Sequence, residues 1–318
     1  MNALAIKRTA MATGSSLKKY PREILASIKE AGGPRTHVTP LVDLDEFESH
    51  DLAALWIGHA TVLLRVGGMN ILTDPVFSRR VGMTIGRITM GVARVLPPAV
   101  DVAHLPTIDA VLLSHAHFDH LDRPSLKRLV AGPARHATVV TAQNTRRLVP
   151  RAHRRVIELP WDESCEVEGR AGGVRLSALR PNHWGARTAV DRHRRFNAYV
   201  LGSDKRRVFF AGDSAHTEAF AEVGRTDLSI FGIGAYDPWI HAHATPEQVW
   251  QMYLGMGGGK PHGCLLPMHH STFVLGREPL DEPMLRLISA AGPNVDRLVA
   301  FRPGMMWSMD AKGSRRTA

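Results

Sequence analysis

The sequence predicts a single large domain of the α/β or α+β class. From residue 52 onwards, short apolar stretches of strand length alternate with helix-like stretches. Hydrophobic residues make up 44% of the 318 residues, which is enough to bury a core in a chain of this length. No linker-like stretch divides residues 51–318, so we expect one domain there, preceded by a partly helical extension over residues 1–50.

The composition excludes several classes of protein. No apolar stretch of about 18 residues is free of charges or breaks, so no membrane-spanning helix is predicted. The chain has only two cysteines, Cys165 and Cys264, and its first twenty residues contain no apolar segment typical of a secretory signal. A disulfide framework is therefore excluded, and we expect a cytoplasmic protein. The formal net charge of +10 fits an anionic substrate, and equally a genome that encodes basic positions as Arg.

The first half of the chain predicts four strands and two helices. In the extension, residues 22–31 have the pattern of a short helix. Strands are expected at residues 52–58, 60–66, 70–73 and 108–114, with Gly67-Gly68 as a turn. A helix is expected at residues 124–130, because Gly132-Pro133 stops it. Residues 81–100 are apolar, but glycines and prolines interrupt them, so we interpret them as a loop.

The second half continues the alternation of strands and helices. Strands are expected at residues 139–141, 156–159, 174–179, 196–201, 208–211, 228–233 and 264–267. Thr245 and Gln248 have the spacing of a capping box with Pro246 at the first helical position, which predicts a helix to about residue 254. Shorter helices are expected at residues 217–223 and 283–290.

The strongest chemical signal is the segment H-A-H-F-D-H at residues 115–120, directly after the predicted strand 108–114. Imidazole and carboxylate groups are ligands that zinc and neighbouring divalent metals prefer. His115 and His117 are two residues apart and would point the same way in an extended segment. Asp119 and His120 follow where the chain turns toward a helix, so they can face a second ion.

This motif resembles the signature of the metallo-β-lactamase superfamily. Within it, the chain is most similar to the branch of the phospholipases D that hydrolyse N-acylphosphatidylethanolamine. The sequence motifs shared with that branch are W-I-G-H-A-T at residues 56–61, L-T-D-P at 72–75, F-F-A-G-D at 209–213 and I-G-A-Y at 233–236. The resemblance covers about residues 50–300 and implies an αββα sandwich of two mixed sheets flanked by helices, with a metal site at one edge.

The resemblance also implies a ligand for every position of a two-metal site. One ion would be held by His115, His117 and His183, and the other by Asp119, His120 and His269, with Asp213 bridging them. His270 is the neighbouring candidate for the last ligand, and His269 is preferred because H-H-S-T-F at residues 269–273 lines up with the branch's His-Trp-Gly-Thr-Phe. Two divalent ions per chain are therefore expected. Zinc is the first expectation, and manganese and iron remain open. Two such ions lower the pKa of a shared water, so that hydroxide is available near neutral pH.

Further residues are candidates for catalysis and substrate binding. Asp119 is counted as catalytic as well as a ligand, and Asp74 is expected to orient a ligand His from outside the metal site. His243 is expected to protonate the leaving group or to bind substrate. For His59, contact with the site is one interpretation, and an ordinary hydrogen-bonded role is the favoured one. Candidate substrate-binding residues follow the ligands or lie in the apolar segment 81–100; they are Tyr236, Trp184, Arg187 and Arg87.

The leading interpretation is a metal-dependent phosphodiesterase of phospholipase D type. An anionic small molecule or lipid is the expected substrate. Peripheral contact with the inner membrane surface and a homodimer are two further interpretations that the sequence leaves open. Two alternatives are a lactonase acting on a phosphorylated sugar lactone and a nuclease similar to ribonuclease Z. The sequence contains no long Gly- or Lys-rich arm between the later ligands, so nucleic acid is the less favoured partner.

Overall fold

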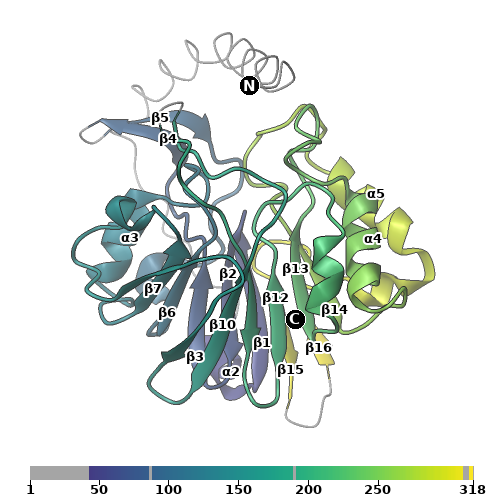
Figure 1. The fold of residues 1–318 in the computed structure, drawn as a ribbon, viewed down its shortest axis with the longest axis horizontal. Coiled ribbons are helices and arrows are strands. Elements are labelled where there is room, and N and C mark those ends of the chain that lie inside the picture. The colour runs from purple at the N-terminus through teal and green to yellow at the C-terminus, as the bar shows by residue number, and fades with distance from the viewer. Residues whose placement is uncertain (1–42, 86–87, 189–190, 311–314, 318) are drawn as a thin grey trace.

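The computed structural model describes residues 43–85, 88–188, 191–310 and 315–317. Two large mixed sheets face each other, and helices cover their outer faces (Figure 1). Helix α3 lies on one side of the pair of sheets, and helices α4 and α5 lie on the other side. This is the αββα sandwich that the sequence analysis predicted. The helix expected at residues 22–31 lies outside the described residues.

The first sheet has eight strands in the order β16-β15-β1-β2-β3-β6-β7-β8. Pairs from β16 to β3 are antiparallel, whereas β3, β6, β7 and β8 run parallel. The strands are β1 (Leu52–Gly58), β2 (Thr61–Val66), β3 (Met69–Thr73), β6 (Ala110–Leu113), β7 (Thr138–Ala142), β8 (Val156–Leu159), β15 (Met306–Met309) and β16 (Arg315–Thr317). Nearly every residue of β1, β2, β3, β6 and β7 is buried, because both faces of the sheet are covered.

The second sheet has six strands in the order β14-β13-β12-β11-β10-β9. Here β12, β13 and β14 run parallel, and the remaining pairs are antiparallel. The strands are β9 (Ser164–Glu168), β10 (Gly173–Leu179), β11 (Ala198–Gly202), β12 (Arg207–Phe210), β13 (Leu228–Gly232) and β14 (Cys264–Met268). Strand β10 alternates between buried and exposed residues, which is the pattern of a strand with one face in the core.

The helices begin where the sequence contains capping residues. Asp43 caps α2 (Leu44–Ser49), and Asp122 caps α3 (Arg123–Val130). The predicted capping box of Thr245 and Gln248 starts α4 (Pro246–Met256), and α5 spans Glu282–Ala291. Four short 3₁₀ helices complete the set: η1 (Val102–His104), η2 (Arg146–Leu148), η3 (Ala219–Val223) and η4 (Gly292–Arg297).

Three apolar layers hold these elements together. One lies between the sheets and includes Trp56, Tyr199 and Trp307. The second joins the outer face of the first sheet to α2 and α3, and Phe47 of α2 is fully buried in it. The third joins the second sheet to α4 and α5.

The structure corrects the interpretation of residues 81–100 as a loop. Strands β4 (Arg80–Ile85) and β5 (Ile88–Ala93) form a separate two-stranded ribbon. Gly82 and Gly91, taken as breaks in the sequence, lie opposite each other in this ribbon. A Cβ atom on Gly82 would lie 2.1 Å from the carbonyl oxygen of Met90, so the close approach of the two strands requires glycine. The helix expected at residues 217–223 is the shorter 3₁₀ helix η3.

Polar side chains join the two sheets at the edge where β6 ends. The Tyr199 hydroxyl on β11 donates a hydrogen bond to the Leu113 carbonyl (2.9 Å) at the end of β6. The next residue along, Ser114, accepts a hydrogen bond through its carbonyl from the Asn197 N–H (2.8 Å). The segment that follows Leu113 is therefore held against the second sheet.

Removing the Tyr199 hydroxyl tests this connection between the sheets. We expect Tyr199→Phe to lower the free energy of unfolding by about 1–3 kcal/mol, because the buried Leu113 carbonyl loses a donor. Urea denaturation measures the change. Arg175→Ala, at an exposed ion pair with Glu166, is the control and should change stability by no more than about 0.5 kcal/mol. Equal effects of the two substitutions would contradict the assignment.

Candidate metal centre

Four of the predicted ligands lie on one short loop between β6 and α3. This loop, residues 114–121, is called the ligand loop below, and it contains His115, His117, Asp119 and His120. A tight turn shapes it, because the His117 carbonyl accepts hydrogen bonds from the N–H groups of His120 (3.2 Å) and Leu121 (2.9 Å). The turn points side chains of consecutive ligands toward the same edge of the sandwich.

The other three predicted ligands follow strands of the second sheet. His183 comes after β10, Asp213 after β12, and His269 directly after β14. Gly212 has a φ of +59°, and a Cβ atom there would lie 2.8 Å from the Ser114 Cβ, so only glycine fits between Asp213 and the ligand loop. These strands end at the same edge of the sandwich as β6. The residues that follow them therefore lie next to the ligand loop.

One oxygen of Asp213 lies at the centre of the site. Its Oδ2 atom is 3.0 Å from His120 Nε2 and 3.3 Å from His269 Nε2. It is also 3.8 Å from the Nε2 atoms of both His115 and His183. Asp213 therefore lies between the two ligand sets that the sequence analysis predicted.

The structure brings the predicted ligands together in two groups. The first ligand group is His115, His117, His183 and Asp213, and the second ligand group is Asp119, His120 and His269 together with His59. Within each group, one ligand atom from every residue lies within 4.8 Å of the others. All seven predicted ligands thus occupy positions from which they can hold metal.

The spacing of the nitrogens fits metal binding. A tetrahedral zinc ion with nitrogen ligands at about 2.0–2.1 Å places these nitrogens about 3.3 Å apart. His183 Nε2 lies 3.3 Å from His117 Nδ1, and His269 Nε2 lies 3.2 Å from His120 Nε2. The buried Oδ1 atom of Asp213 has no hydrogen-bond partner, which leaves it available to a second cation.

Burial and the two carboxylates set the charges of the site. Burial lowers the pKa of His117 to about 3, and His183 adds to this effect. Burial alone would raise the pKa of the Asp213 carboxyl, but His120, His269 and His243 hold it well below its usual range. Burial likewise opposes protonation of His269, yet Asp213 and Asp119 raise its pKa to about 9. His120 also has a raised pKa, because Asp213, Asp119 and Asp74 outweigh its burial.

Asp74 contacts both the backbone and a side chain of the ligand loop. Its Oδ1 atom accepts a hydrogen bond from the Ser114 N–H (2.7 Å), and its Oδ2 atom lies 2.7 Å from His120 Nδ1. A proton on Nδ1 leaves the His120 Nε2 atom free to bind metal on the side of Asp213. Burial raises the pKa of the Asp74 carboxyl, although His120 and Ser114 act in the opposite direction.

His59 lies beside the second ligand group. Its Nε2 atom lies 3.0 Å from Asp119 Oδ2, and its ring centroid is 4.0 Å from that of His269. Its φ of +53° is unusual for a residue other than glycine. Hydrogen bonds fix this backbone, because the His59 carbonyl accepts from Trp56 Nε1 and from the His269 N–H. The G-H-A-T motif at residues 58–61 is the sequence feature that could have indicated this position of His59.

The predicted catalytic and substrate residues lie at different distances from the centre. His243 faces it, with Nδ1 3.9 Å from Asp213 Oδ2. Trp184 packs its ring edge-on against His117 at 5.8 Å and is 43% exposed. The Tyr236 hydroxyl donates to Glu282 (2.7 Å), and its ring lies against Arg286, whose Cζ atom is 4.8 Å from the ring centroid. Arg187 donates to carbonyls of the ligand loop. Arg87 lies outside the described residues.

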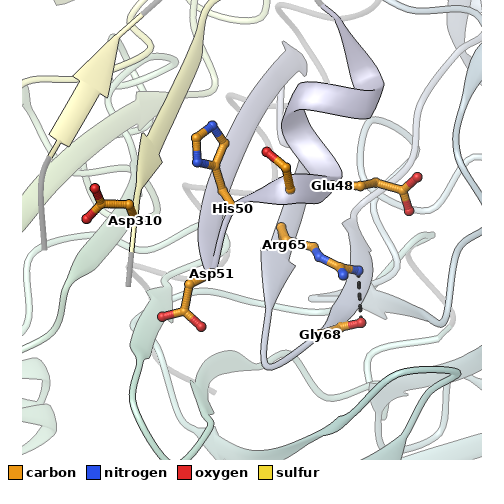
Figure 2. Close-up of a pocket in the computed structure, with 7 residues that line it drawn as sticks. Glu48, His50, Asp51, Arg65, Gly68 and Asp310 are labelled. Atoms are coloured by element: carbon orange, nitrogen blue, oxygen red, sulfur yellow. Dashed lines mark hydrogen bonds between the residues drawn. The ribbon is translucent and has the colours of Figure 1, made fainter. Parts of the chain in front are cut away.

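A surface hollow lies elsewhere in the described structure. It has a volume of about 340 Å³ and is lined by Glu48, Ser49, His50, Asp51, Arg65, Gly68 and Asp310 (Figure 2). It lies at the beginning of β1, whereas His59 follows the end of that strand about 25 Å away, given about 3.3 Å per residue. Figure 2 shows Arg65 bonded to the Gly68 carbonyl, with Asp51 and Asp310 extending away from it. The donor chemistry, rather than the size of a cavity, therefore locates the site.

Among the described residues, every helix falls short of the length and apolar character that crossing a bilayer requires.

The central position of Asp213 gives a prediction for metal content. Asp213→Ala should lose metal from both ligand groups, because its Oδ2 atom is shared between them. Asp74→Ala should weaken binding by about 10–100-fold, as expected when a group that orients a ligand is removed. Equilibrium dialysis followed by elemental analysis measures both. Full metal content in Asp213→Ala would refute the shared position.

The raised pKa values predict that metal binding releases protons. In the metal-free chain His120 and His269 are protonated at neutral pH, and a metal ion requires their neutral forms. We expect release of about two protons per chain at neutral pH, with a smaller number as the pH rises past about 9. Calorimetric titration in buffers of different ionisation enthalpy counts them. A release that does not depend on pH would contradict this charge assignment.

Comparison with known proteins identifies relatives of this chain. A family model described as a beta-lactamase superfamily domain matches residues 69–270. An uncharacterised protein of Mycobacterium tuberculosis (strain ATCC 25618 / H37Rv) is 32% identical over 262 residues, covering 80% of this chain and 68% of that protein. The N-acyl-phosphatidylethanolamine-hydrolyzing phospholipase D 1 of Caenorhabditis elegans is 30% identical over 250 residues, covering 74% of this chain and 68% of that enzyme.

A solved structure shows the same fold. The metallo hydrolase Igni18 of the archaeon Ignicoccus hospitalis matches with a TM-score of 0.58 at 17% identity, over 84% of this chain and 98% of its own. The family model spans more than half of the chain and includes all seven predicted ligands. The resemblance seen in the sequence is thereby confirmed, and the chain belongs to the beta-lactamase superfamily.

Proposed function

We propose that the protein is a metal-dependent phosphodiesterase of phospholipase D type that uses two divalent ions, with zinc as the expected metal. The observation that carries this proposal is the position of Asp213 Oδ2 between the two ligand groups. A donor set of imidazoles and carboxylates without cysteine suits zinc. The phosphodiester substrate is supported by the 30% identity to the phospholipase D of Caenorhabditis elegans.

The bound metals would supply a water of lowered pKa as the nucleophile and positive charge beside the oxygens of the phosphate. The protein residues place the other groups. Asp119 is the more exposed of the two ligand carboxylates, so it can accept a hydrogen bond from the attacking water. A new bond forms between the water oxygen and phosphorus, and the bond to the ester oxygen breaks. The water gives up one proton in this step, and the leaving oxygen takes up one proton, so that an alcohol and a phosphate monoester result.

His243 is the residue best placed to serve the leaving group. Its ring centroid lies 5.2 Å from those of both His183 and His269, so it borders the two ligand groups. Burial lowers its pKa well below the usual range, which keeps the imidazole neutral in the metal-free chain. A neutral imidazole has one donor and one acceptor, so His243 can donate a hydrogen bond to the leaving oxygen.

We propose a lipid as the phosphodiester. Apolar side chains are exposed beside the ligands and on the ribbon: Trp184 is 43% exposed and Met83 on β4 is 53% exposed. An acyl chain bound against these side chains would remove their apolar surface from water while the phosphate lies at the metals. Because such a lipid resides in a membrane, we propose that the protein contacts an anionic membrane surface peripherally.

The acyl chain length of the substrate tests this proposal. Phosphodiesters should be hydrolysed faster than neutral lactones, and each added methylene that becomes buried should lower KM about fourfold, which corresponds to about 0.8 kcal/mol. Steady-state kinetics on phosphodiesters of increasing acyl length measures this. Met83→Ser should reduce the dependence on length, whereas Val295→Ser, an exposed apolar position on η4, is the control. Faster turnover of lactones than of every phosphodiester would refute the proposal.

A further inference from the structure

Arg187 lies four residues after the ligand His183, and its guanidinium group extends toward the ligand loop. Its Nη1 atom donates a hydrogen bond to the Ala116 carbonyl (2.9 Å) and a second one to the Leu121 carbonyl (2.8 Å). Ala116 and Leu121 are fully buried and lie outside any helix or strand, so their carbonyls need donors of this kind. Between these two carbonyls the chain contains His117, Asp119 and His120.

The same guanidinium group also covers an aromatic ring of this loop. The Arg187 Cζ atom lies 4.0 Å from the centroid of the Phe118 ring, the stacking distance of a cation–π contact. Burial lowers the pKa of Arg187 to about 10, so it remains charged at neutral pH, and the nearby Asp122 favours that charge. Arg187 therefore holds the loop by two hydrogen bonds and one ring contact.

These contacts differ from those of a substrate-binding arginine. An arginine that binds a phosphate directs its donors into the site, usually as a two-pronged pair. Here Nη1 is engaged by two backbone carbonyls, and the face of the group is against Phe118. The two bonds connect the segment after His183, in the first ligand group, to the loop that contributes to both ligand groups.

We propose that Arg187 is a positioning residue that clamps the ligand loop, so that the ligands on residues 115–120 meet metal together with His183. This inference rests on the proposed function only in requiring that the two ligand groups bind metal. It replaces the role of substrate ligand that the sequence suggested for Arg187. The loss of the clamp should loosen the ligands and weaken metal binding by about 10–100-fold, the usual effect of removing a group that orients ligands.

The test compares three variants of the full chain. Arg187→Ala removes all three contacts. Arg187→Lys keeps the charge, but an ammonium group lacks the planar face and the fixed geometry, so its effect should be intermediate. Arg128→Ala is the matched control: Arg128 lies on α3, close after the loop in sequence, and donates to Asp101 (2.8 Å) rather than to the loop.

Metal dissociation constants from chelator competition and the visible absorption spectrum of the cobalt-loaded protein are the readouts. We expect Arg187→Ala to bind metal about 10–100-fold more weakly with a changed cobalt spectrum, while Arg128→Ala matches the wild type. If Arg187→Ala does not fold, Phe118→Leu, which removes the ring contact and keeps both hydrogen bonds, should weaken binding by a smaller factor and change the spectrum.

Two outcomes would overturn the inference, and they differ from each other. Unchanged metal affinity and spectrum in Arg187→Ala and Phe118→Leu, with KM for charged substrates raised in Arg187→Ala, would show that Arg187 binds substrate. In that case the proposed function stands and the clamp fails. A wild-type protein that binds no divalent metal would instead refute the proposed function, and the clamp would fail with it.

Discussion

A single buried oxygen, Asp213 Oδ2, faces imidazoles from four separate segments of the chain: the ligand loop, His183, His243 and His269. A buried carboxylate is costly unless positive charge compensates it. In the metal-free chain the raised pKa values of His120 and His269 supply that charge, whereas most neighbouring imidazoles stay neutral because of burial. Divalent cations would compensate the same carboxylate without these protons, so the charge arrangement of the site favours metal.

The arrangement of the two sheets brings ligands from both of them to one edge. Strand β6 leads into the ligand loop, and β10, β12 and β14 lead into the other ligands. Backbone strain accompanies the convergence: His59, Asp74 and His269 have positive φ values although none is glycine. Such conformations cost of the order of 1–3 kcal/mol each and persist only where surrounding contacts fix them. Hydrogen bonds from Trp56 and Thr61 to these loops, and the apolar layer between the sheets, provide that support.

Local patterns predicted most of the strands and helices, whereas the αββα arrangement and the full ligand set followed from the resemblance to the superfamily. The H-A-H-F-D-H segment and the capping box of Thr245 each occupy a few consecutive residues, so the sequence shows them directly. The β4–β5 ribbon was missed because the pairing of Gly82 with Gly91 is visible only once the strands are aligned. The pairing of β1 with β15 joins residues about 250 apart, which no local pattern reveals. The contacts of His59 with Asp119 and of Arg187 with Phe118 join residues about 60 and about 70 apart, which is also beyond the reach of a local pattern.

The central claim is that Asp213 holds two metal ions between the two ligand groups. Crystallographic anomalous scattering at the zinc absorption edge tests it most directly, because each metal ion gives its own peak independently of activity. The account predicts two peaks a few ångströms apart, as in other two-metal sites, with Asp213 in contact with both. A single peak, or two peaks of which one lies away from Asp213, would contradict it.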